Sequence, residues 1–420
     1  MNRSTKPGLQ KLIHLLQSRA DIYNLTGRIG PSLRDVRKAL AVARSCGDRE
    51  AQARCLLQLS DVHCTISDFA AVRQTAGEAL AIYREIGDGW GQAQSLNNIG
   101  YAQDSISNYR QALDYYSQSL LIQEQIGDRQ GQASSLNNIG YVHDGLGDYA
   151  TALDYYHRSL QIRGEVGDRR GEASNLNNIG AVRYCLGEYS PALDLYRRSL
   201  QIQEQIGDRW GQAYSLQNIG VTLSNLGEQA AALDHFGRSL LIREEIGDRS
   251  GQAQSLNNVG QINLEQDDFC SARRLLERAA EIAGELRENE LCRRVAVSLG
   301  RLALAEGDLT QARFQAGTVM RLAAELQSKL GQAEANLLQA RIDAAELSWL
   351  SAFDRFEQAI FLYQEIKQPQ DTAIAYYYYS QALIAKGDQE KGGLCRIKAR
   401  KIFERLNAAG WLKILDGRSI

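Results

Sequence analysis

Proline is scarce in this chain, with only four among 420 residues. Because proline interrupts helices, its scarcity favours long helices and argues against flexible linkers. No stretch approaches the roughly 18 apolar residues of a membrane span, and the first ten residues lack the apolar core of a signal peptide. The sequence therefore predicts a cytoplasmic protein without membrane insertion.

A strong charge of either sign is also missing. The formal net charge is −2, which gives no electrostatic footprint for nucleic acid or for acidic membranes. The seven cysteines are odd in number, and their spacing fits neither a disulfide framework nor a zinc ribbon. The five histidines show no metal-ligand spacing, and no glycine-rich phosphate loop follows a strand. We therefore expect no metal, no cofactor and no catalytic residue, and we predict that the protein is not an enzyme.

What the chain does have is a 40-residue repeat that keeps its phase. The phrase Ser-Leu-Asn-Asn-Ile-Gly at 95–100 returns in closely related form at 135–140, 175–180, 215–220 and 255–260. A unit of this size cannot bury its apolar face alone and must stack on its neighbours. Repetition also argues against an active site, since a catalytic group is needed only once.

Each unit has the pattern of a helical hairpin. In residues 88–126, Gly87 can end one helix and Asp88 can cap the free amides of the next. Apolar residues then return at helical spacing from Leu96, and a second helix is predicted over 109–126. Small residues at fixed points on both helices allow the two backbones to approach closely. One such position is small in all ten units: Ala20, Ser60, Gly100, Gly140, Gly180, Gly220, Gly260, Gly300, Ala340 and Ser380.

These residues resemble the tetratricopeptide repeat. Its motifs appear as Leu-x-x-Ile-Gly on the first helix, Gly-Asp-Tyr at the turn and Ala-x-x-x-Tyr-x-x-Ser-Leu on the second, and residues 136–160 fit them almost throughout. The 40-residue period is similar to the longer variant of LGN/Pins adaptors, kinesin light chain and long bacterial arrays. The resemblance covers about 7–406 and is strongest over 87–266. It implies an all-α, right-handed superhelical solenoid of about ten helix-turn-helix repeats.

We predict that residues 1–420 form one such solenoid. A C-terminal helix over about 407–416 is expected to cap the last apolar face, as terminal repeats require. The predicted units are 7–46, 47–86, 87–126, 127–166, 167–206, 207–246, 247–286, 287–326, 327–366 and 367–406.

A ladder of side-chain amides is the first candidate for binding. The resemblance implies that first helices line a concave groove, where one row reads Asn97, Asn137, Asn177, Gln217 and Asn257. A carboxamide both donates and accepts hydrogen bonds, so this row could pair with the backbone of an extended peptide. The alternative is that recently duplicated units copied a tolerated residue. The second asparagine of each pair is expected either to hydrogen-bond the adjacent unit or to contact the ligand.

Tyrosines and arginines in neighbouring rows complete the predicted site. Tyr101, Tyr141 and Tyr214 offer the amphipathic surface that anchors interfaces, with packing against neighbouring units as the alternative. Arg294 and Arg301 lie seven residues apart on one helix face and could grip a carboxylate. The other interpretation is that they are solvated, or paired with Glu290 or Glu334.

The function predicted from these features is that of a protein interaction scaffold or adaptor. It would bind a peptide or partner segment in the concave groove, with arginines favouring acidic or C-terminal ends. The alternative is a peptide- or ligand-responsive regulatory sensor of a signalling pathway. Self-association through the terminal units is a further use that the array allows, and no nucleic acid partner is expected.

Overall fold

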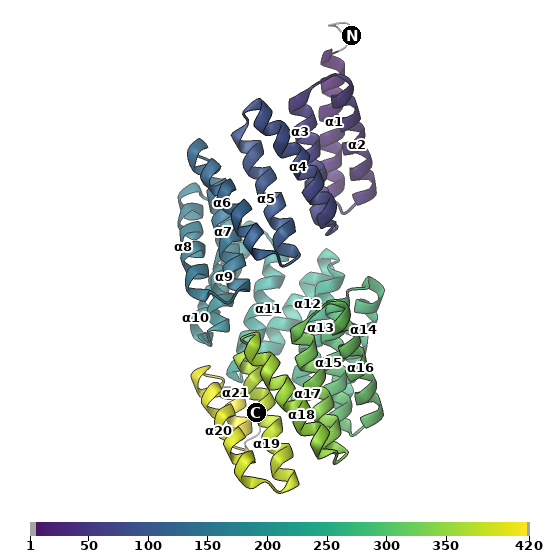
Figure 1. Cartoon of the computed structure of the whole chain (residues 1–420), viewed down its shortest axis with the longest axis vertical. Helices are drawn as coiled ribbons and strands as arrows, with labels where there is room; N and C mark the ends of the chain where they lie inside the picture. Colours follow the sequence, from purple (N-terminus) through teal and green to yellow (C-terminus); the bar gives the residue numbers. More distant parts are fainter. Residues whose placement is uncertain (1–5, 418–420) are drawn as a thin grey trace. The chain divides into compact units, whose positions relative to one another are not determined.

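In the computed structural model, residues 6–417 are described, and every regular element among them is an α-helix (Figure 1). This confirms the all-α prediction and the arrangement in consecutive helix pairs. The chain divides into two compact units, residues 1–178 (unit 1) and 179–420 (unit 2). The boundary falls inside α9.

The helices have nearly uniform lengths of 17–20 residues, apart from the short last one. Unit 1 contains α1 Lys6–Leu25, α2 Ile29–Ser45, α3 Arg49–Thr65, α4 Phe69–Ile86, α5 Gly89–Ser105, α6 Tyr109–Ile126, α7 Arg129–Gly145 and α8 Tyr149–Val166. The helix that crosses the boundary is α9 Arg169–Cys185. Unit 2 continues with α10 Tyr189–Ile206, α11 Arg209–Leu226, α12 Gln229–Ile246, α13 Arg249–Glu265, α14 Phe269–Leu286, α15 Asn289–Glu306, α16 Leu309–Glu325, α17 Lys329–Ala345, α18 Trp349–Glu365, α19 Pro369–Lys386, α20 Gln389–Arg405 and α21 Ala409–Leu415.

The recurring Gly-Asp step ends one helix and starts the next. Gly87 adopts φ +73°, a left-handed conformation that glycine reaches without a steric penalty. The carboxylate of Asp88 then accepts a hydrogen bond from the backbone N–H of Gly91, as the sequence predicts. The same cap is formed by Asp48, Asp128, Asp208 and Asp248.

The residues after the Gly-Asp step tie each helix pair to its neighbours. In unit 1, the side-chain amide of Gln132 donates to the carbonyl of Gln123 at the end of the preceding helix, over 3.1 Å. Arg129 forms an ion pair with Glu165 at the far end of its own repeat. These two contacts explain why Gly-Asp-Arg-x-Gly-Gln recurs, although exposed ion pairs of this kind stabilise little.

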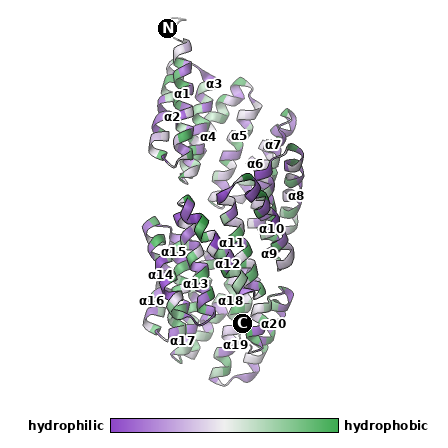
Figure 2. Cartoon of the chain, turned by 180° about the vertical axis from the view of Figure 1, so that it is seen from behind, coloured by the Kyte–Doolittle hydropathy of each residue, from purple (hydrophilic) through white to green (hydrophobic). Residues whose placement is uncertain are grey.

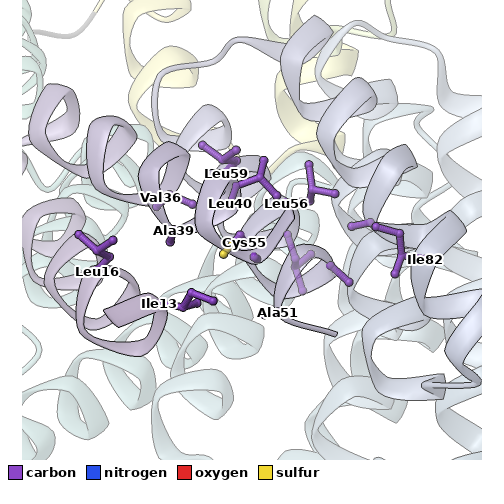
Figure 3. Packing of buried hydrophobic residues seen from close by; sticks show 14 of the residues in the cluster. Ile13, Leu16, Val36, Ala39, Leu40, Ala51, Cys55, Leu56, Leu59 and Ile82 are labelled. Carbon is purple, nitrogen blue, oxygen red and sulfur yellow. The ribbon is translucent and has the colours of Figure 1, made fainter. Parts of the chain in front are cut away.

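The buried core runs continuously from one helix pair into the next. In unit 1, Ile13 of α1, Val36 of α2, Cys55 and Leu56 of α3 and Ile82 of α4 belong to one cluster (Figure 3). First helices of successive pairs also contact one another directly, α1 with α3, α3 with α5 and, in unit 2, α13 with α15 and α15 with α17. Each pair thus covers the apolar face of the next.

Glycines of the first helix allow a large side chain of the second helix to pack on its backbone. A Cβ placed on Gly220 would lie 2.7 Å from the ring of Phe236, which is 2% exposed. Gly140 meets the ring of Tyr156 in the same way, at 2.9 Å. The row of small residues found in the sequence is therefore the row that receives these side chains.

This contact gives a stability prediction. Gly220→Ala should lower the midpoint of thermal unfolding, because overpacking against the Phe236 ring costs about 1–3 kcal/mol and exceeds the gain in helix propensity. Gly237→Ala in the next helix is the matched control, since nothing lies within 4 Å of its added Cβ. It should leave the midpoint unchanged or raise it. Unfolding followed by circular dichroism measures both, and equal midpoints for the two variants would contradict this account.

Candidate functional site

Unit 2 contains a partly open cavity of about 320 Å³. First helices line most of it: α11, α13, α15, α17 and α19 all contribute side chains. Tyr184 of α9, Phe236 of α12, Tyr363 of α18 and Trp411 of α21 complete the wall. Side chains from repeats that are distant in sequence therefore face one space.

A polar network closes unit 2 around this cavity. The side-chain amide of Gln370 on α19 donates to the Asn225 carbonyl on α11 over 2.7 Å. Asn225 in turn donates to the hydroxyl of Tyr184 at 2.5 Å, and the hydroxyl of Tyr189 donates to Gln370 at 3.2 Å. These bonds join residues up to 181 positions apart. They hold the last repeats against the first ones of the same unit.

An apolar contact reinforces this closure. The Trp411 ring stacks on the buried ring of Phe403 with 5.3 Å between centroids. Leu406 is buried beside them and packs against the turn at Gly187, where an added Cβ would lie 2.8 Å from the Leu406 Cα. The helix α21 contacts both α20 and α11. The C-terminal segment thus forms part of the cavity wall as well as the end of the array.

Three arginines face the cavity. Arg301 lies 3.8 Å from the carboxylate of Glu265. Arg294 and Arg341 have no hydrogen-bond or ion-pair partner for their side chains within the described residues, 6–417, although Arg341 lies 3.9 Å above the ring centroid of Tyr378. Burial lowers the pKa of both guanidinium groups, because desolvation disfavours a charge.

Glu290 and Glu334, the glutamates near these arginines, form ion pairs with Arg293. Arg293 is 1% exposed. The sequence interpretation that paired a glutamate with Arg294 therefore applies to Arg293 instead. Arg294, the next residue, is left facing the cavity.

Two carboxylates in the cavity are also perturbed. Burial raises the pKa of Asp371 to about 6, and the positive charge of Arg301 only partly offsets this effect. Burial likewise raises the pKa of Glu265, again offset in part by Arg301. Desolvation therefore dominates at both groups.

The repeats match a known family model. The tetratricopeptide repeat model matches residues 91–165, 131–205 and 211–285. Residues 91–205 and 211–285 are therefore tetratricopeptide repeats. A search of curated protein sequences finds no significant match.

Several solved structures share this fold at low sequence identity. A Rap conjugation gene regulator of plasmid pLS20, in complex with the Phr* peptide, aligns with TM-score 0.59 and 11% identity over 95% of this chain and 96% of its own. A Rap protein complexed with Competence and Sporulation Factor aligns with TM-score 0.56 and 14% identity. The alignment covers 90% of this chain and 99% of the Rap protein. A signal transduction ATPase from Pyrococcus horikoshii with a tetratricopeptide repeat sensor aligns with TM-score 0.57 and 13% identity. The alignment covers all of this chain and 55% of the ATPase. Identities this low establish the fold alone.

Only two of the ten residues predicted for the site line this cavity, Arg294 and Arg301. In the same unit, Asn257 is 1% exposed, and the Gln217 amide donates to Gln254 over 3.4 Å. Tyr214 stacks on Trp210 with 5.7 Å between centroids and remains exposed.

The other five predicted residues lie in unit 1. Asn97 accepts a hydrogen bond from the hydroxyl of Ser135 at 3.1 Å, and Asn137 accepts one from Asn178 at 2.9 Å. Both bonds link neighbouring tetratricopeptide repeats. The remaining three are Asn177, which is buried, and Tyr101 and Tyr141, which are exposed.

The second asparagines behave in two ways. Asn98 donates to Asp61 at 2.7 Å and Asn178 donates to Asn137, which confirms the expected bonding to the adjacent repeat. Asn258 differs, because it lines the cavity and its buried amide nitrogen has no hydrogen-bond partner in the described chain. One row of the repeat thus serves packing in unit 1 and the cavity in unit 2.

Sequence reasoning missed several cavity residues. Arg341 occupies the same repeat position as Arg301, so a signal for it was present. Tyr378 belongs to the Tyr376–Tyr379 run, whose residues occupy both core and groove positions of the repeat. Asp371 and Trp411 gave no such signal, because only the closure of unit 2 brings them to the cavity.

No described helix is both long and apolar enough to cross a membrane. Hydrophobic and hydrophilic residues alternate along the helices instead of collecting in one apolar segment (Figure 2).

The pKa of Asp371 gives a prediction about pH. A carboxyl group whose pKa is higher in the folded than in the unfolded protein makes folding less favourable as pH rises through that interval. Asp371→Asn should therefore raise the free energy of unfolding by about 2–3 kcal/mol at about pH 7.5 and by only about 1 kcal/mol at about pH 4.5. Urea unfolding at both pH values measures this effect. Asp354→Asn on the exposed face of α18 is the control, and a pH-independent difference for Asp371→Asn would contradict the prediction.

Proposed function

We propose that this protein is an interaction scaffold that binds a peptide or short partner segment, with the cavity of unit 2 as its principal site. The observation that carries this proposal is the cavity itself, which collects side chains from six successive repeats and is lined by charged groups, two of them arginines without partners among the described residues. Ligand sites combine apolar walls with a few convergent polar groups. Here Trp411 and Tyr378 supply aromatic surface, while Asn258 and Gln261 supply amides.

The chemistry of this wall suits a peptide. Carboxamides can serve both the N–H and the C=O of a backbone, and arginines can hold a carboxylate with paired hydrogen bonds. Two proteins that share the fold are described in complex with Phr* peptide and with Competence and Sporulation Factor. Their likeness supports the same class of ligand for this chain.

Unit 1 carries the remaining predicted contacts. Its exposed Tyr101 and Tyr141 are 42% and 57% accessible and offer amphipathic surface, together with the half-buried Asn97 and Asn137 of the amide row, whereas Asn177 is buried. We assign these residues to a second contact surface for a partner, separate from the cavity of unit 2.

The proposal includes neither catalysis nor a cofactor. No group of three or more potential metal ligands occurs among the described residues, and the charged groups of the cavity are suited to holding a ligand. All seven cysteines are free, which supports a reducing compartment such as the cytoplasm. Protein or peptide partners fit the net charge of −2 better than nucleic acid does. Self-association through the terminal repeats can be tested by measuring the molecular mass at several concentrations.

Affinity selection tests this function. The purified protein is incubated with a library of random peptides, and the retained peptides are identified by mass spectrometry. We expect retention by the wild type and at least about tenfold less by Arg294→Gln/Arg301→Gln, since a bidentate arginine contact contributes roughly 1.5–3 kcal/mol. Arg313→Gln is the matched control, because this exposed arginine pairs with Glu346 away from the cavity. No retained peptide, or equal retention by the double variant, would reject the proposal.

A regulatory sensor is the second candidate function. The closure of unit 2 through Gln370, Asn225 and Tyr189 favours it, because a ligand in the cavity would contact both sides of that closure. A ligand that binds only the closed form shifts the population towards it.

Small-angle scattering distinguishes the sensor from the passive scaffold. A retained peptide should decrease the radius of gyration of the wild type if closure responds to the ligand. Gln370→Ala weakens the closure, so this variant should start from a larger radius and respond more strongly. An unchanged radius on saturation would favour the passive scaffold.

A further inference from the structure

We infer that the cavity of unit 2 selects a short dipolar ligand, a free peptide of a few residues whose two charged ends are both bound inside. Its carboxylate would lie at Arg294 and Arg341, and its ammonium group at Asp371. This inference rests on the proposed function and narrows it from peptides in general to free, short ones.

The cationic end of the cavity is defined by contrast with its neighbour. Arg293 and Arg294 are adjacent on α15, and the buried Arg293 is satisfied by two glutamates. Arg294 and Arg341 line the cavity, and neither has a carboxylate within 4.0 Å among residues 6–417. Both arginines are half-buried, and a partly desolvated charge without a partner is costly, so an anionic ligand would supply what the protein does not.

The surroundings of Arg341 indicate how that ligand would bind. One face of the guanidinium group lies over the Tyr378 ring at 3.9 Å. Stacking covers the face of the planar group and leaves its N–H edge for an acceptor. The buried amide nitrogen of Asn258, which also lacks a partner in the described chain, lines the same cavity as a further donor.

The anionic end is defined by a second contrast. Asp343 is a buried carboxylate of unit 2 that accepts hydrogen bonds from Gln339, Ser351 and Arg355. Asp371 has no hydrogen-bond donor within the described part of the chain, yet it lines the cavity. Asp371 lies in the first turn of α19, where the helix dipole favours a carboxylate. That position alone does not explain why the carboxylate faces the cavity without a donor. An ammonium group would satisfy it.

The size of the cavity limits how much of a ligand can lie inside it. A volume of about 320 Å³ is close to the lower end of the roughly 300–1,000 Å³ typical of small-molecule sites. The bond between Gln370 and Asn225 and the ring of Trp411 bound the space. A few residues with free ends fit these limits better than a segment inside a folded partner.

The inference is tested with three tripeptide libraries of equal composition: one with free ends, one N-acetylated and one C-amidated. Retention is measured by mass spectrometry on the full-length wild type. We expect the free library to be retained at least tenfold better than either blocked library. This comparison needs no variant, so it does not depend on how substitutions affect folding.

Two variants then assign the ends. Arg341→Gln should reduce the preference for a free carboxylate and keep the preference for a free amine, whereas Asp371→Asn should do the reverse. Arg313→Gln and Asp354→Asn, on exposed outer surfaces of the same unit, should change neither preference. Identical effects of the two cavity variants on both preferences would overturn the assignment of the ends.

The remaining outcomes separate this inference from the proposed function. Equal retention of free and blocked tripeptides would reject end recognition while leaving peptide binding in place. Retention of longer peptides alone would reject the short ligand. Failure to retain any peptide, of any length or form, would reject the proposed function and this inference with it.

Discussion

The structure depends on one contact, the packing of a second-helix side chain directly on a first-helix glycine. Without a Cβ at Gly220 or Gly140, the ring of Phe236 or Tyr156 reaches the backbone of the partner helix. This approach sets the spacing within a pair, and the spacing sets how pairs stack. The caps at the Gly-Asp steps and the glutamine bonds between repeats then fix each pair against the next.

The fold could be predicted from the sequence because these local requirements repeat. The cap at Asp88 and the small residue at Gly100 recur every 40 positions, and each recurrence confirms the others. The candidate site could be predicted only in part. Arg294 and Arg301 were found because they lie seven residues apart on one helix. Asp371 and Trp411 belong to no repeated pattern, and only contacts between distant repeats bring them to the same cavity.

The second asparagines show why position in a repeat does not determine role. Asn98 and Asn178 donate to neighbouring repeats in unit 1, whereas Asn258, at the same position of its repeat, has a donor without a partner in the cavity of unit 2. Identical residues are used differently because the repeats around them differ. The regular repeats build the scaffold. Residues of unit 2 that differ from the repeat pattern supply the charged groups of the cavity.

The bond between Tyr189 and Gln370 has a consequence for folding. In an open repeat array, stability is close to a sum of terms from nearest neighbours, and the ends can fray independently. Here residues 181 positions apart are in contact, so the first and last repeats of unit 2 must order together. Such a non-local contact slows folding while it increases cooperativity. Unit 2 should therefore unfold in one transition, more like a globular domain than like a string of repeats.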